Sequence, residues 1–226
     1  VMTLAFPKRL FDGYRSFRRA RLPVEQSRFQ ALAESGQQPE IMVIGCCDSR
    51  VSPEVIFDAQ PGELFVSRNV ANLVPVYQPD GGAHGVSAAL EYAVNVLRIK
   101  HIVVLGHAQC GGIRAFIDNI EPLSPGDFIG QWIKLIAPAA QRLGATPTAP
   151  DAAYVEKLAF ESIKQSIANL RTFPCIRTLE EKGRLSVHGA YFGVADGRLL
   201  AYDEPRGAFE AVAEDSWRTA FATPRF

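Results

Sequence analysis

Two stretches of the chain share one pattern, in which a short apolar run rich in β-branched residues ends abruptly in polar and reactive side chains. The first run covers residues 41–45 and continues as Cys46, Cys47, Asp48, Ser49 and Arg50. The second covers residues 102–106 and continues as His107, Ala108, Gln109, Cys110, Gly111 and Gly112. Runs of this length and composition predict buried strands. Because an unpaired buried charge is costly, the polar residues after each strand indicate one site assembled from two strand ends.

Helical and extended patterns account for most of the remaining chain. Helices are predicted over residues 6–20, 24–35, 86–98, 112–119, 127–142 and 152–171, with a short one from Ser52 to about residue 58. Further strands are predicted over residues 63–68, 184–192 and 198–202, the last two joined through Asp196 and Gly197. The order strand, helix, strand is that of a βαβ unit, so the predicted fold class is α/β, with a central, mostly parallel β-sheet flanked by helices.

Composition narrows the class of protein and the compartment. At 226 residues, 47% hydrophobic and 21% charged, the chain has the make-up of an ordinary globular enzyme. Lys plus Arg and Asp plus Glu both number 24, so no net field favours nucleic acid or an anionic membrane as a partner. No apolar run approaches the roughly 20 residues of a membrane helix, and no secretory pattern opens the chain. Three of the four cysteines sit in the two motifs, which favours a reactive or metal site in a reducing cytosol, so a cytoplasmic location is predicted.

The ligand chemistry of the two motifs predicts zinc. Cys46, His107 and Cys110 supply two thiolates and one imidazole, a set that zinc uses in catalytic sites. Beyond the carboxyl ends of parallel strands, ligands from both motifs can meet. Three protein ligands leave one position for water, whose pKa zinc lowers enough to give hydroxide near neutral pH. Spacing does not decide between Cys46 and Cys47, because adjacent side chains on a strand point in opposite directions.

Other interpretations of these residues explain less. Cys175, outside both motifs, is predicted to be an inert core thiol. Residues 106–112 come close to a phosphate-binding loop, but Gly112 stands where that loop needs its lysine. A Cys–His hydrolase would leave the second and third ligands unexplained.

At these motifs the sequence resembles the β-class carbonic anhydrases. The resemblance rests on Cys46-x-Asp48-Ser49-Arg50 and on His107-x-x-Cys110-Gly111-Gly112, which begins 61 residues after Cys46. It extends through residues 61–72, 89–93 and 187–191, and covers about residues 25–205. It implies that Cys46, His107 and Cys110 are the zinc ligands and that Cys47 is a variable neighbour.

The resemblance also implies an assembly. The chain would form a single β-carbonic-anhydrase-like domain, with an N-terminal helical arm (1–36), a zinc-binding α/β core (37–205) and a C-terminal extension (206–226). In this family N-terminal helices embrace a partner, giving a homodimer or a dimer of dimers with pockets at the subunit interface. By position, Gln37 of the neighbouring subunit, Phe65 and Val70 would line the carbon dioxide pocket.

The implied reaction is the reversible hydration of carbon dioxide to bicarbonate and a proton by zinc-bound hydroxide. Asp48 would accept a hydrogen bond from that hydroxide, and Arg50 would hold Asp48 ionised. Backbone N–H groups of Gly111 and Gly112, at a helix start, would steady bicarbonate. His84 is either a proton shuttle or a surface histidine without a role.

Three further alternatives remain open. A hydrolase of carbon disulfide or carbonyl sulfide could use the same scaffold, and a non-catalytic zinc protein could use Asp48 as a permanent fourth ligand. In one branch of the family the equivalent Asp closes the site at lower pH, together with a Trp and the Arg at the position of Arg68. Val43 occupies that Trp position here, which predicts an open site.

Overall fold

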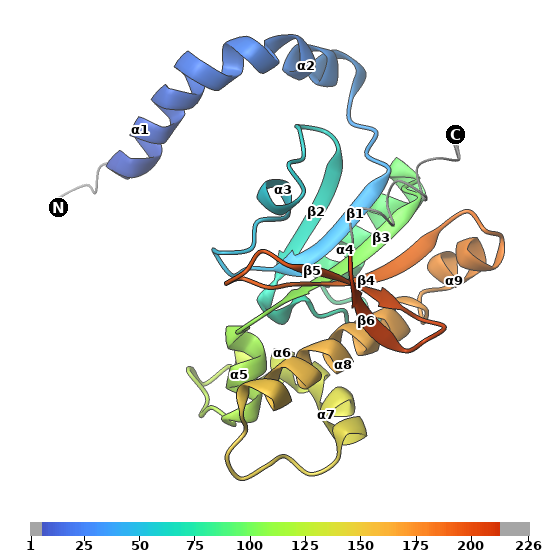
Figure 1. Ribbon diagram of the computed structural model, residues 1–226. Helices are drawn as coiled ribbons and strands as arrows, with labels where there is room; N and C mark the ends of the chain where they lie inside the picture. The colour runs from blue at the N-terminus through green and yellow to red at the C-terminus, as the bar shows by residue number, and fades with distance from the viewer. Residues whose placement is uncertain (1–5, 213–226) are drawn as a thin grey trace. The chain divides into compact units, whose positions relative to one another are not determined.

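The computed structural model describes residues 6–212, which separate into two compact units, one ending at Gln38 and the other beginning at Pro39 (Figure 1). The first unit is one continuous helical run, composed of α1 (Lys8–Ser16), η1 (Phe17–Arg21) and α2 (Leu22–Ser35). The predicted break between two helices is therefore wrong. Pro23 lacks a backbone N–H, yet the helix continues through this residue. Pro23 stands in the first turn of α2, just after the wider π-helical turns of η1.

The second unit is built on a six-stranded sheet in the order β2-β1-β3-β4-β5-β6. Its strands are β1 (Ile41–Cys46), β2 (Leu64–Asn69), β3 (His101–His107), β4 (Ser186–Phe192), β5 (Leu199–Asp203) and β6 (Ala208–Ala211). The first four strands in this order run parallel, and β5 and β6 continue antiparallel. The predicted α/β class with a mostly parallel sheet is confirmed. The sheet also continues past residue 205, since β6 lies beyond it.

Helices flank the sheet and fill its connections. They are α3 (Pro53–Ile56), η2 (Val70–Asn72), α4 (Gly85–Glu91), η3 (Tyr92–Leu97), α5 (Gly111–Ile117), α6 (Phe128–Ile133), η4 (Lys134–Ile136), α7 (Ala137–Leu143), α8 (Ala152–Leu170) and α9 (Pro174–Glu181). The helix predicted over residues 127–142 is confirmed as one continuous helical run made of α6, η4 and α7, in which a 3-10 turn precedes Pro138 in the first turn of α7. Neither α9 nor β6 was predicted.

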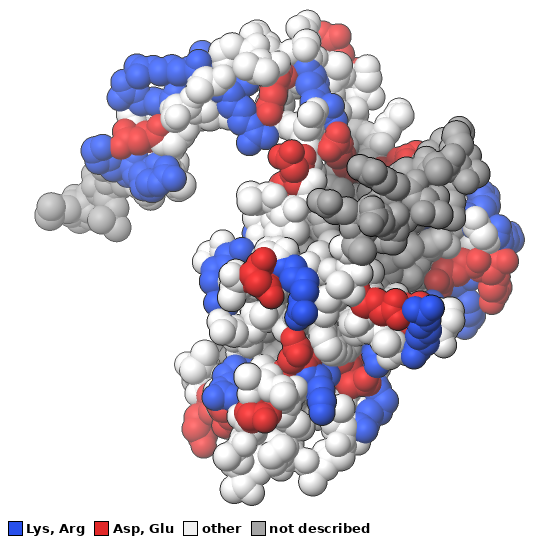
Figure 2. Space-filling view, in the orientation of Figure 1, with Lys and Arg blue, Asp and Glu red and all other residues white. Residues whose placement is uncertain are grey.

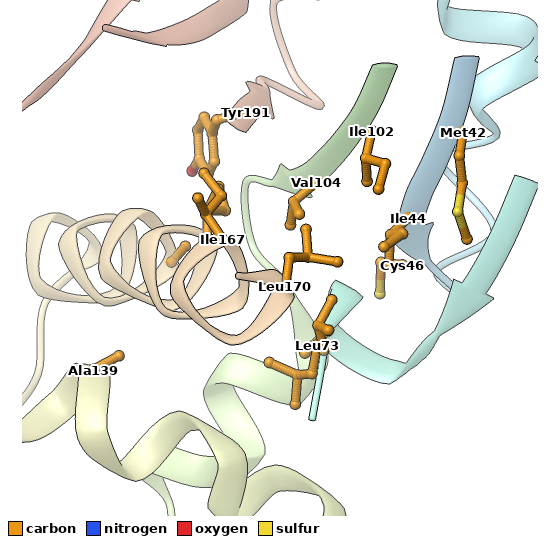
Figure 3. Packing of buried hydrophobic residues seen from close by; sticks show 14 of the residues in the cluster. Met42, Ile44, Cys46, Leu73, Ile102, Val104, Ala139, Ile167, Leu170 and Tyr191 are labelled. Carbon is orange, nitrogen blue, oxygen red and sulfur yellow. The ribbon is translucent and has the colours of Figure 1, made fainter. Parts of the chain in front are cut away.

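The core lies between the sheet and α8 (Figure 3). Met42, Ile44 and Cys46 alternate along β1 and share the face of the sheet on which α8 packs. A glycine in β3 permits the close approach, since a Cβ on Gly106 would stand 2.7 Å from Cδ1 of Ile163 on α8. The same helix therefore packs tightly against the strand end that carries the second motif.

Charge is distributed without a dominant sign over the α/β unit. On the face shown in Figure 2, its Lys and Arg side chains alternate with Asp and Glu. Within residues 6–212, none of the helices combines the length and the apolarity needed to span a bilayer.

Candidate metal centre and active site

Three side chains from the two motifs meet beyond the carboxyl ends of neighbouring strands. Cys46 ends β1, His107 ends β3, and Cys110 immediately precedes α5. Register explains the meeting, because Gly45 pairs with Leu105 and so places Cys46 and His107 at one edge of the sheet. One ligand atom from each of the three residues lies within 4.8 Å of the other two, and all three residues are buried.

The imidazole of His107 is prepared to act as a ligand. Its Nδ1–H donates to the carbonyl oxygen of Ala108 at 2.8 Å, which leaves the lone pair of Nε2 available. Nε2 is buried and has no hydrogen-bond partner among the described residues. An unpaired buried nitrogen beside two sulfurs fits a metal of the zinc type, which prefers this donor set. Of the adjacent pair, Cys46 is buried and belongs to this group, whereas Cys47 is exposed and lies outside it.

The two thiols share their proton unequally. A hydrogen bond from Cys110 lowers the pKa of Cys46 to about 4, and His107 and the backbone N–H groups of Asp48 and Ala71 act in the same direction, while burial opposes them. The thiolate of Cys46 and burial together raise the pKa of Cys110. The first proton is therefore lost from this pair more easily than the second, and a bound cation would favour ionisation of both thiols.

Asp48 lies beside the group and is tied to Arg50. Nε of Arg50 donates to Oδ1 at 2.9 Å, Nη2 donates to Oδ2 at 2.7 Å, and the Arg50 backbone N–H donates to Oδ1 at 3.0 Å. These bonds hold the pKa of Asp48 well below its usual range. Oδ2 lies 4.0 Å from Nε2 of His107, so a carboxylate that stays ionised faces the three-residue group. Nη2 of Arg50 also donates to the carbonyl of Gln109 at 3.1 Å, which links the two motifs.

Arg68, on β2, supports the turn that carries Cys46 and Asp48. Its Nε donates to the carbonyl oxygen of Cys46 at 2.7 Å, and its Nη2 donates to that of Asp48 at 2.6 Å. Both acceptors are backbone atoms, so Arg68 fixes the path of the chain between the two residues without occupying their side chains.

Comparison with known proteins decides the family. Residues 41–199 match the family model described as carbonic anhydrase. A carbonic anhydrase of Pseudomonas aeruginosa is 38% identical over 205 residues, which cover 91% of each chain. The chain belongs to the β-class carbonic anhydrases. The solved β-carbonic anhydrase CcaA superimposes with a TM-score of 0.84 at 31% identity, covering 92% of each chain. One of two β-carbonic anhydrases of Sordaria macrospora, described as tetrameric, gives a TM-score of 0.65 at 31% identity and covers 85% of this chain and 91% of its own.

The residues predicted to bind substrate in this carbonic anhydrase are only partly brought together. Val70 is 36% exposed and touches the start of α5, where a Cβ on Gly112 would stand 2.9 Å from Cγ1 of Val70. Phe65 stacks on Tyr92 at 5.9 Å between ring centroids. Gly111 begins α5 with open space around it, whereas the N–H groups of Ile113 and Gly112 act to lower the pKa of the Cys110 thiol. The roles of these residues toward bicarbonate stay predictions, as does that of Gln37, which lies in the first unit.

His84 lies at a different place in the enzyme. Its Nε2 is 2.6 Å from Oδ1 of Asp80, and it lines a cavity of about 570 Å³ with Glu91 and Cys175. None of the three predicted ligands lines that cavity. The suggested role in proton transfer therefore gains no geometric support, and Cys175 is half-buried at the edge of the core.

Sequence reasoning missed the backbone supports of the site. The clamp by Arg68 and the bond from Arg50 to the Gln109 carbonyl involve main-chain atoms, which leave no residue pattern. A third support is the hydrogen bond from Trp132 on α6 to the backbone carbonyl of Val70, which joins residues 62 positions apart. Only the position of Arg68 at the end of a predicted strand offered any signal.

Proposed function

We propose that this chain catalyses the reversible hydration of carbon dioxide to bicarbonate and a proton, with zinc held by Cys46, His107 and Cys110. The observation that carries the proposal is the buried, unpartnered Nε2 of His107 beside two cysteine sulfurs and an ionised Asp48. When bound, zinc lowers the pKa of a coordinated water so that a hydroxide nucleophile exists near neutral pH. Because two thiolates weaken the Lewis acidity of the metal, we expect this to require a higher pH than at a zinc bound by three histidines.

The residues of the chain orient the reacting groups. Asp48 accepts a hydrogen bond from the attacking hydroxyl group and thereby directs its lone pair at the carbon of carbon dioxide. Arg50 keeps Asp48 ionised and fixes its plane through two parallel bonds. His107 is held in one tautomer by its bond to Ala108, so only Nε2 is offered to the metal.

The arrangement around Asp48 supports an open site. Both of its carboxylate oxygens accept hydrogen bonds from Arg50, and these would compete with coordination of a metal. At the position where the closing branch of the family carries Trp, Val43 packs in a small apolar cluster with Leu105 and Ala190. The bonds from Arg50 to both carboxylate oxygens also argue against a structural zinc protein in which Asp48 is a permanent ligand.

We further propose that the enzyme works as a homodimer or a dimer of dimers. The helical run over residues 8–35 buries none of its residues and exposes Leu10, Phe11, Tyr14 and Val24 by 50% or more, which suits pairing with a second copy. The tetrameric description of the Sordaria relative supports such an assembly. A partner could then supply Gln37 to the carbon dioxide pocket. The cytoplasmic location stays a prediction.

Stopped-flow hydration of carbon dioxide by zinc-loaded protein, from neutral to alkaline pH, tests the proposal. We expect rates that rise with pH to a plateau. Cys46→Ser should lose zinc and activity, whereas Cys47→Ser, which changes the exposed neighbour, is the matched control and should keep both. Absence of hydration at every pH by protein of full zinc content would refute the reaction. Equal zinc content in the two serine variants would refute the ligand assignment.

A further inference from the structure

A tryptophan far from both motifs contacts the backbone next to the metal centre. Nε1–H of Trp132, on α6, donates to the carbonyl oxygen of Val70 at 2.8 Å. Trp132 is half-buried and packs against the core, so its ring has a fixed surrounding. Val70 begins the turn η2, which follows β2 and lies against the start of α5.

This turn has a backbone conformation that ordinary residues avoid. Ala71 has φ 64° and ψ 23°, and Asn72 has φ 49°, so two consecutive non-glycine residues are left-handed. This conformation is unfavourable for residues with a Cβ and persists only where its surroundings hold it. The strain therefore requires partners on both sides of the turn.

The partners after the turn come from Asn69 and α8. The Asn69 side chain bonds the N–H and the carbonyl of Leu73 at 2.8 and 3.0 Å. Ser166 on α8 bonds the carbonyl of Asn72 and the N–H of Val74 at 3.4 and 3.3 Å. Before the turn, the bond from Trp132 holds the carbonyl that enters it.

That carbonyl shares a peptide unit with a donor to the metal centre. The carbonyl of Val70 and the N–H of Ala71 belong to one planar trans unit, so they point in opposite directions. The N–H of Ala71 lowers the pKa of the Cys46 thiol, so this side of the peptide faces the metal centre. The bond from Trp132 thus orients a peptide of the metal centre, and the turn that contains this peptide packs against Gly112, two residues after the predicted ligand Cys110.

We propose that Trp132 is a positioning residue of the metal centre, which orients the Val70–Ala71 peptide so that the Ala71 N–H stays directed at the sulfur of Cys46. The proposal rests on the function proposed above, because it concerns the same three ligands. It also assigns a task to α6, whose sequence carries none of the motifs. Trp132 itself touches neither ligand nor substrate and acts only through the backbone.

Metal affinity of Trp132→Phe, measured by chelator competition with zinc, tests the role apart from catalysis. Loss of a residue that supports a ligand typically weakens metal binding by about 10- to 100-fold, and we expect the lower end here, about tenfold. Tyr154→Phe is the matched control: it removes a 3.2 Å bond from Tyr154 to the Thr146 hydroxyl, which involves neither η2 nor a predicted zinc ligand, and should leave zinc affinity unchanged. The kcat/KM of Trp132→Phe should fall when the protein is incompletely loaded and recover with excess zinc.

A third protein separates the hydrogen bond from the ring. Benzothienylalanine, placed at position 132 by amber suppression, keeps the shape of tryptophan but replaces the N–H by sulfur. It should weaken zinc binding as Trp132→Phe does. Wild-type affinity in the benzothienylalanine protein, or an equal affinity in Trp132→Phe and Tyr154→Phe, would overturn the proposal alone. A wild-type protein that binds no zinc would overturn both this inference and the proposed function.

Discussion

Gly112 offers the sharpest test of how the metal centre is packed. It lies in the first turn of α5, two residues after Cys110, with the strained turn at Ala71 directly against it. In Gly112→Ala the new Cβ would stand 2.8 Å from the Cβ of Ala71 and 2.9 Å from Cγ1 of Val70. The first contact is with an atom fixed to the backbone, so rotation of a side chain cannot relieve it.

The expected magnitude follows from that distance. Carbon atoms pack at roughly 3.5–4.0 Å, so α5 and the turn must separate by several tenths of an ångström. Overpacking of this kind typically costs about 1–3 kcal/mol of stability. Since the turn carries the Ala71 N–H, which lowers the pKa of the Cys46 thiol, and Gly112 follows Cys110 by two residues, the displacement should also weaken zinc binding.

Urea unfolding of the metal-free protein and chelator competition measure the two effects. Gly111→Ala is the matched control, because it makes the same replacement one residue earlier with nothing within 4 Å of the new Cβ. Any gain in helix propensity is common to both variants, so their difference isolates the clash. If Gly112→Ala proves as stable as Gly111→Ala and binds zinc equally well, α5 does not pack on the turn as described.

Three other predictions concern charge. Arg50→Gln should return the pKa of Asp48 toward its ordinary value of about 3.9. Since a depressed pKa stabilises the folded protein at pH above that value and the contribution is lost as pH falls through the folded-state pKa, the wild type should be more stable than the variant near neutral pH, with a difference that shrinks at acidic pH. Carboxyl NMR titration of the wild type would show an unshifted pKa for Asp48 if the pairing is wrong. Zinc uptake at pH 7 should release roughly one proton, from Cys110, because the pKa of Cys46 is lowered and that of Cys110 is raised. Calorimetry in buffers of different ionisation enthalpy counts the released protons, and release of two would contradict the difference in pKa between the two thiols. Arg68→Gln should lower both zinc affinity and kcat/KM, because the carbonyl oxygens of Cys46 and Asp48 lose their hydrogen bonds from Arg68. Unchanged values in both assays would show that Arg68 does not support the site.

The sequence predicted those features that depend on local pattern. Two apolar runs identified β1 and β3, and the rule that parallel strand ends meet at one edge brought Cys46 near His107. Adjacent cysteines could not be distinguished in this way, because strand alternation says that one faces the site but not which one. The burial of Cys46 and the exposure of Cys47 depend on which face of β1 meets α8.

Features that depend on tertiary packing could not be predicted. The short helix α9 and the strand β6 were missed because runs of eight and four residues give little periodicity. Proline ended a helix at neither place, since Pro23 follows a π-helical stretch and Pro138 follows a 3-10 turn, each within a continuous helical run. The bond from Trp132 to Val70 spans a distance along the chain over which residue spacing carries no information.

The path of the chain between the two motifs gives zinc a second physical role. His107 follows Cys46 by 61 residues, and the intervening segment contains β2 and α4. A metal bound to both would act as a cross-link that closes this loop, which restricts the unfolded chain more strongly than the folded one. Metal and fold are then thermodynamically linked: the unfolding midpoint should rise with free zinc concentration, and a chelator should loosen the sheet edge as well as stop catalysis. In a cell, zinc supply would set how long the protein survives, not only how fast it works.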